Sequence, residues 1–166
     1  MKKCLFLFLL FPFIIKAQDL SLYQKKIFVQ HGDTMPYRIL LPENYDAHKK
    51  YPLLIFLHGS GERGNDNELQ LLHGGSLFLK DSIRKAFPAI VVFPQCAQSS
   101  YWSNVNIVEE NGKRTFNFTS NGLPTQAMVL LQELIHKLRG EYKVEKKRIY
   151  VGGLSMGGMG TQEIVR

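Results

Sequence analysis

A G-x-S-x-G motif centred on Ser155 lies near the end of the 166-residue sequence. Residues 148–152 before it have the composition of a buried strand, and the residues after it are compatible with a helix. A strand that bends sharply into a helix holds such a serine hydroxyl out above the sheet, and glycines at positions 153 and 157 avoid steric collisions there. The backbone N–H of Met156 would begin the helix and could donate to a developing oxyanion. The motif therefore predicts acyl transfer with Ser155 as the nucleophile.

A second feature agrees with this chemistry. The apolar run Leu53–Leu57 is followed by the glycine-rich segment H-G-S-G-E-R-G at residues 58–64. In the architecture that uses a serine turn of this kind, the second oxyanion N–H comes from the loop after an earlier strand, which here indicates Ser60 or Gly61. For His58 we favour a structural role, holding the loop by hydrogen bonds, over a direct acid–base role. The segment lacks G-K-[ST], so it is not a phosphate-binding P-loop.

Strands and helices alternate along the chain, which predicts an α/β fold with a mostly parallel sheet of about five strands. Two β-like runs flank turn residues 31–34, so the sheet should begin with an antiparallel hairpin. Residues 95–123 are polar and are expected to be irregular. The predicted strands are 27–30, 37–41, 53–57, 89–93 and 148–152, and the predicted helices are 65–73, 81–86, 123–139 and the segment from residue 155 onward.

The first seventeen residues have the pattern of a secretory signal peptide. Lys2 and Lys3 precede an apolar run, and Ala17 offers a small residue for cleavage. The run is short for a transmembrane helix, so we favour a cleaved signal peptide over an uncleaved membrane anchor. We therefore expect export to the periplasm or the cell exterior, without stable membrane insertion. Removal of residues 1–17 takes away three lysines, so the formal net charge falls from +7 to about +4 for residues 18–166. Short basic groups such as Lys49-Lys50 then favour solvated faces over nucleic-acid binding.

Cys96 is the one cysteine that remains after the leader. It cannot close an intramolecular disulfide, and a small packed residue is favoured over a nucleophile at this position. Histidines and acids do not cluster at ligand spacings, and no cofactor motif is present, so neither a metal nor a cofactor is expected.

Taken together, these segments resemble the α/β-hydrolase superfamily. The similarity is to exported bacterial esterases and peptidases related to polyhydroxybutyrate depolymerases, feruloyl esterases and the prolyl oligopeptidase catalytic domain. The resemblance implies a three-layer sandwich with Ser155 as nucleophile and Met156 with Ser60 or Gly61 as the oxyanion hole. Trp102 and His58 are the candidates for the lining of the substrate pocket, with anchoring of the core as the alternative for Trp102. The resemblance is carried by residues 37–42 with 51–54, residues 58–64, residues 93–96 leading to Trp102, and residues 148–158.

The remaining partners of the serine are the main departure from the family pattern. The family order is serine, then acid, then histidine. After Ser155 there is one acid, Glu163, expected to face away from the serine on the same helix, and no histidine. The upstream histidines at positions 31, 48, 73 and 136 are expected to be surface residues. We therefore expect residues 18–166 to be the N-terminal portion of the domain, with the acid and the histidine beyond residue 166.

Three functional interpretations follow from this. The first is a secreted carboxylesterase that acts on a small-molecule or polymer-linked ester. The second is a serine peptidase of the prolyl oligopeptidase type. The third is an inactive fragment or non-catalytic binding remnant, because the given residues supply a nucleophile and an oxyanion hole without a base.

Overall fold

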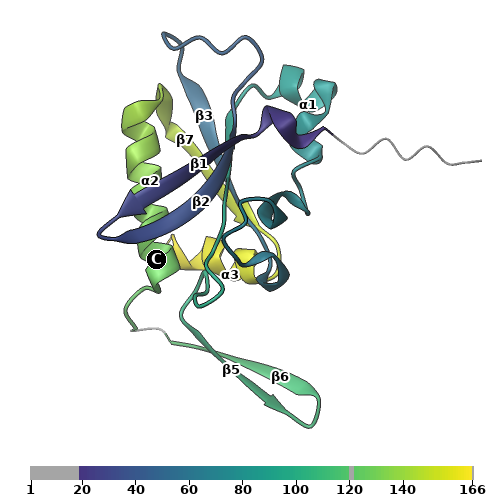
Figure 1. The fold of residues 1–166 in the computed structure, drawn as a ribbon, viewed down its shortest axis with the longest axis vertical. Coiled ribbons are helices and arrows are strands. Elements are labelled where there is room, and N and C mark those ends of the chain that lie inside the picture. Colours follow the sequence, from purple (N-terminus) through teal and green to yellow (C-terminus); the bar gives the residue numbers. More distant parts are fainter. Residues whose placement is uncertain (1–18, 120–121, 166) are drawn as a thin grey trace, which may run out of the picture.

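A five-stranded mixed sheet in the order β1-β2-β4-β3-β7 forms the centre of the computed structural model, which describes residues 19–119 and 122–165 (Figure 1). The signal peptide predicted at residues 1–17 lies outside the described residues. β1 pairs antiparallel with β2, β2 pairs antiparallel with β4, and β4, β3 and β7 run parallel to one another. The α/β prediction and the opening hairpin are confirmed. The strands are Gln24–Gln30 (β1), Asp33–Leu40 (β2), Tyr51–Leu57 (β3), Ile90–Pro94 (β4) and Val144–Gly153 (β7).

Helices cover both faces of this sheet, as expected for a three-layer sandwich. α2 (Gln126–Glu141) lies on one face, and α1 (Asp81–Ala86) lies on the other (Figure 1). Alternate residues of β4 separate the two cores: Ile90 and Val92 pack toward α2, whereas Val91 and Phe93 belong to the cluster on the other face. α3 (Met156–Glu163) packs against β7 and β3, and Met156 joins the core on the α2 side. Short 3₁₀ turns lie at Leu20–Leu22, Ser60–Glu62, Leu69–Leu71 and Leu77–Leu79.

The longest helix, α2, begins three residues later than the sequence pattern predicts. The Thr125 hydroxyl oxygen accepts a hydrogen bond from the Met128 N–H at 3.2 Å, which caps the first turn. The same hydroxyl donates to the Tyr101 carbonyl oxygen at 2.6 Å, so the cap also ties the helix to the preceding loop. None of the helices in the described ranges is long and apolar enough to span a membrane.

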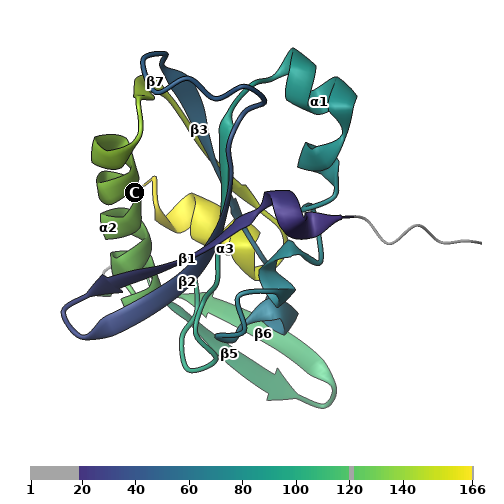
Figure 2. The same ribbon diagram turned by 45° about the horizontal axis from the view of Figure 1, so that its top comes forward.

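Two parts of the secondary-structure prediction are wrong. Residues 95–123 are not irregular throughout, because β5 (Val105–Glu110) and β6 (Lys113–Phe118) form an antiparallel hairpin that extends away from the sheet (Figure 2). Its turn is Asn111-Gly112, with φ values of 51° and 73°. Asn-Gly is a strong hairpin signal, but the polar composition of the flanking residues led to the prediction of an irregular segment. The helix expected at residues 65–73 is a single 3₁₀ turn. There the Asp66 carboxylate accepts from the Glu68 and Leu69 N–H groups, which favours a turn over a longer helix.

Replacement of Thr125 by Ala should lower the free energy of unfolding by about 1–2 kcal/mol, because the helix loses its cap and the Tyr101 carbonyl loses its donor. Thr125→Ser keeps the hydroxyl and should restore most of that loss. Urea unfolding followed by circular dichroism measures the difference, and Thr115→Ala on the exposed strand β6 is the control. An equal loss for Thr125→Ala and Thr115→Ala would contradict the cap.

Candidate active site

Ser155 occupies a strained bend between β7 and α3. β7 ends at Gly153 and α3 starts at Met156, and Ser155 between them has φ 53° and ψ −119°. A positive φ is rare for a residue with a side chain, and such strain persists only where the surroundings enforce it. The Leu154 N–H donates to the Leu57 carbonyl at 3.2 Å, and the Gly157 N–H donates to the Leu154 carbonyl at 2.8 Å. These bonds hold the bend closed and leave Ser155 exposed at the carboxyl end of the strand.

The glycines on either side of Ser155 are required by the close approach of α3 to β3. A Cβ atom on Gly157 would overlap the Leu57 carbonyl group, whose carbon would lie 2.5 Å away. A Cβ atom on Gly153 would lie 2.6 Å from the Leu57 carbonyl oxygen. Real Cβ atoms essentially never come this close to backbone atoms. The two glycines of the motif thus permit the packing that sets the serine above the sheet edge.

The glycine-rich loop lies directly beside this serine. A Cβ atom built on Gly59 would lie 3.7 Å from the Ser155 Cβ atom, so the loop and the bend are neighbours. Ser60 and Gly61 are exposed and belong to a 3₁₀ turn, whose Glu62 N–H donates to the Gly59 carbonyl at 3.4 Å. Within the described residues, the N–H groups of Met156, Ser60 and Gly61 have no hydrogen-bond acceptor. Free donors of this kind next to a serine are the components of an oxyanion hole.

His58 holds the loop from inside the protein. Its exposed fraction is 1%, and its Nε2 accepts a hydrogen bond from the Cys96 N–H at 3.0 Å. Nδ1 therefore carries the proton and donates to the Gly59 carbonyl oxygen at 2.6 Å. Burial lowers the pKa of His58, which keeps the imidazole neutral in this arrangement. Both ring nitrogens are occupied, so the geometry fits the loop-holding interpretation, and His58 neither lines a pocket nor is free to act as a base.

Trp102 is buried in the core instead of lining a pocket. Its exposed fraction is 0%, and its indole N–H donates to the His58 carbonyl oxygen at 3.2 Å. Its ring also meets the His58 ring edge to face, with centroids 5.4 Å apart. A Cβ atom on Gly160 of α3 would lie 2.5 Å from the Trp102 Cβ atom. The indole fills the space between α3 and the loop that contains His58, which fits the core-anchoring alternative for Trp102.

Gln95 is a positioning residue that the sequence reasoning did not identify. Its side chain has an exposed fraction of 0% and bridges the end of β4 to the glycine-rich loop. Its amide oxygen accepts from the Asn67 N–H at 2.7 Å, and its amide nitrogen donates to the Glu62 carbonyl at 3.2 Å. The Gly64 N–H adds a bond to the Cys96 carbonyl at 2.9 Å. The sequence does show a glutamine directly after a strand that ends in proline. Its hydrogen-bond partners lie about thirty residues away in sequence, so the local pattern does not reveal its bridging role.

Cys96 is a packed residue and not a nucleophile in this structure. It is fully buried, and burial raises the pKa of its thiol to about 12. The thiol therefore remains protonated at neutral pH, where a thiolate would be needed for attack.

A base for Ser155 is absent from the described part of the chain. The imidazole of His31 approaches Glu133 at 3.8 Å, and that of His73 approaches Glu62 at 3.6 Å. No hydrogen bond from any histidine of residues 19–119 or 122–165 reaches the Ser155 hydroxyl. These residues also contain no group of three or more potential metal ligands from His, Cys, Asp and Glu.

The sheet order, the strained serine bend and the adjacent glycine-rich loop define an α/β-hydrolase, and the comparisons specify the family. Residues 29–161 match the model of the Esterase family, described as "Putative esterase". The chain belongs to this family. No curated protein matches the sequence.

Solved esterase structures share the fold. A thermostable esterase is 32% identical, with a TM-score of 0.74 over 88% of this chain and 38% of that chain. A CE1 ferulic acid esterase from Anaeromyces mucronatus, in complex with ferulic acid, is 17% identical, with a TM-score of 0.52 over 81% of this chain and 49% of that chain. The feruloyl esterase module from Clostridium thermocellum, complexed with sinapinate, is 20% identical, with a TM-score of 0.52 over 85% and 47%. The chain thus spans between about two fifths and one half of these proteins.

Gly157→Ala should destabilise the protein by roughly 2–3 kcal/mol or more, because the new methyl group has no space beside the Leu57 carbonyl. Gly158→Ala is the matched control. Its Cβ atom would have no neighbour closer than 3.7 Å, so the helix should gain about 0.5–1 kcal/mol. Denaturant unfolding of both variants measures the contrast. Equal stability of the two variants would show that α3 does not approach β3 this closely.

The stability of the protein should decrease as the pH falls below about 6.5, the ordinary pKa of histidine. The pKa of His58 is lowered on folding, so the unfolded chain binds the proton first and acidification favours unfolding. His58→Gln, which cannot titrate, should be less stable at neutral pH and should lose less stability on acidification. His136→Gln, at an exposed position, should follow the wild type. Unfolding free energies between pH 7.5 and 5 test this, and parallel curves for the wild type and His58→Gln would refute it.

Proposed function

We propose that Ser155 is the nucleophile of a carboxylic ester hydrolase. The observation that carries the proposal is the backbone of Ser155, held at φ 53° and ψ −119° beside the free N–H groups of Met156 and the Ser60–Gly61 turn. Membership of an esterase family supports cleavage of esters over that of other acyl compounds. The loop held by His58 and Gln95 adds a preorganised oxyanion site, which is usually the largest single contribution to such catalysis.

In the proposed reaction the Ser155 oxygen attacks the ester carbonyl carbon, and its proton passes to a histidine base. The carbonyl oxygen becomes an oxyanion, which accepts hydrogen bonds from the Met156 N–H and from an N–H of Ser60 or Gly61. Collapse of this intermediate expels the alcohol, which takes the proton from the histidine and leaves an acyl group on Ser155. Water then attacks the acyl-enzyme with the same histidine as base, and the acid is released.

We place the histidine and the acid that orients it after residue 166. This follows the order of serine, acid and histidine in α/β-hydrolases. It also accords with the position of Glu163, the one acid after Ser155, which lies at the far end of α3. We further propose that the protein is exported and that its substrate is an ester attached to a polysaccharide or another polymer. The similar structures from Anaeromyces mucronatus and Clostridium thermocellum are feruloyl esterases in complex with ferulic acid and with sinapinate, which supports an aromatic acid as the acyl part of the ester.

A fluorophosphonate probe and a chromogenic ester series test the proposal. In a form of the protein that continues past residue 166, the probe should label Ser155, and p-nitrophenyl esters should be hydrolysed faster than matched peptide anilides. Ser155→Ala should abolish labelling and lower kcat by at least about 10⁴-fold. Ser82→Ala, at an exposed serine of α1, should change neither result.

Labelling that survives Ser155→Ala would disprove the assignment of the nucleophile. Faster cleavage of the anilides would replace the esterase proposal with the peptidase one. Absence of labelling in the longer form would leave the protein as a non-catalytic member of the family.

A further inference from the structure

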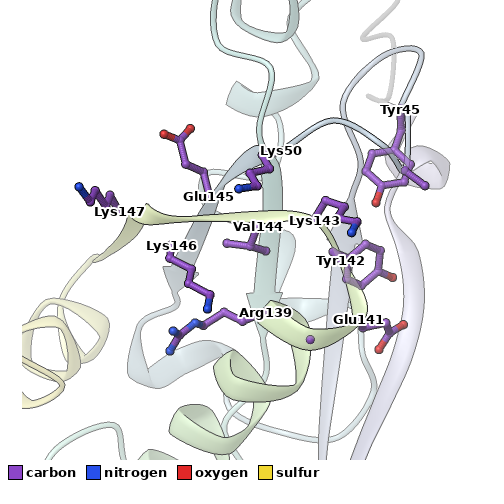
Figure 3. A pocket seen from close by; sticks show the side chains of 12 residues that line it. Tyr45, Lys50, Arg139, Glu141, Tyr142, Lys143, Val144, Glu145, Lys146 and Lys147 are labelled. Atoms are coloured by element: carbon purple, nitrogen blue, oxygen red, sulfur yellow. The ribbon is translucent and has the colours of Figure 1, made fainter.

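A basic hollow of about 780 Å³ lies at the start of β7, at the opposite end of the strand from Ser155 (Figure 3). Its walls come from the end of α2, the first residues of β7 and the loop before β3. Val144 pairs with Tyr51 of β3 and Gly153 pairs with Leu57, six residues further along β3, so at the usual rise per strand residue the two ends of β7 are roughly 20 Å apart. The hollow is therefore separate from the candidate active site.

The charges around this hollow are unbalanced. Five cationic side chains line it, all of them exposed: Lys50, Arg139, Lys143, Lys146 and Lys147. Two acids also line it, but each pairs with a cation outside the lining. Glu141 pairs with Lys137, and Glu145 pairs with Arg148 at 3.2 Å. Among the described residues no carboxylate pairs with any of the five lining cations, so the hollow carries a positive potential without an internal counterion.

The fold assembles this charge from separate parts of the sequence. Lys50 precedes β3, Arg139 lies in the last turn of α2, and the three other lysines belong to residues 143–147. In Figure 3 the side chains of Arg139 and Lys146 extend to the same side of β7. The end of the α2 dipole offsets part of the charge of Arg139. Glu141 and Glu145 pair with Lys137 and Arg148 and with none of the four lining lysines, whose mutual repulsion a bound anion would relieve.

The lining combines cationic side chains with aromatic rings. Four of the five cations are lysines, which act as mobile point charges, and the fifth is an arginine with a bidentate fork. Tyr45 and Tyr142 line one part of the hollow, with ring centroids 6.3 Å apart, and both rings are half-buried. Amphipathic rings of this kind can pack against the apolar faces of sugar rings while lysines hold the carboxylates.

We propose that this hollow is an accessory site that binds an acidic polysaccharide, a polymer of carboxylated sugars. The site would retain the polymer on the enzyme at a distance from the reacting ester. The choice of a polysaccharide rests on the proposed ester-hydrolase function, whereas the selection for polyanions rests on the unpaired cations alone. The binding should weaken as salt increases, because exposed charges are screened within about 10 Å at 0.1 M salt.

Fluorescence anisotropy with labelled polygalacturonate tests the site, using Ser155→Ala protein so that the polymer is not altered. Lys143→Gln combined with Lys146→Gln should weaken binding by roughly five- to tenfold. Lys80→Gln combined with Lys85→Gln removes the same charge from the exposed ends of α1 and should weaken it less than about twofold. A fully methyl-esterified, uncharged polymer should bind at least about tenfold less tightly than the charged one.

Equal losses in the two double variants would overturn the site, because binding would then follow net charge alone. Duplex DNA that binds as tightly as polygalacturonate at the same salt concentration would overturn the choice of polysaccharide. The test is independent of catalysis. An inactive enzyme would still bind the polymer, and an active esterase that fails to bind it would refute this proposal and leave the proposed function intact.

Discussion

The contact between α3 and the carboxyl end of β3 constrains the rest of the site. The backbone of α3 comes so close to the Leu57 carbonyl that positions 153 and 157 have no room for a Cβ atom. The Leu57 carbonyl also accepts the Leu154 N–H, so the strand, the bend and the helix are joined at one point. This contact allows β7 to turn abruptly into α3 and holds Ser155 in a conformation that an unconstrained residue would avoid.

A second set of bonds holds the loop that faces the serine. His58, Gln95 and the Gly64 N–H all connect residues 58–67 to the segment directly after β4. The Trp102 indole connects this loop to α3, since it donates a hydrogen bond to the His58 carbonyl and packs against Gly160. These polar side chains are buried and satisfied, which makes the loop rigid. Such rigidity is what the proposed oxyanion site requires, because donors of this kind are effective only when they are already in place.

The two ends of β7 have different chemical characters. At the carboxyl end the strand meets a helix N-terminus, where free N–H groups favour negative charge. At the amino end it follows the C-terminus of α2, where the polypeptide places lysines and an arginine around a hollow. One strand therefore connects the proposed oxyanion site with the proposed polyanion-binding hollow, and its length keeps the two apart.

The sequence alone determined the local features. Continuous apolar runs identified the central strands, a 3.6-residue periodicity identified α2, and G-x-S-x-G between a strand and a helix located the bend at Ser155. These signals suffice because the physical cause of each lies within a few adjacent residues. Tertiary structure decided the burial of Trp102, the bridging role of Gln95 and the gathering of Lys50, Arg139 and Lys146 around one hollow. Each of these depends on residues brought together from distant parts of the chain by sheet pairing and helix packing, and no local pattern specifies such contacts.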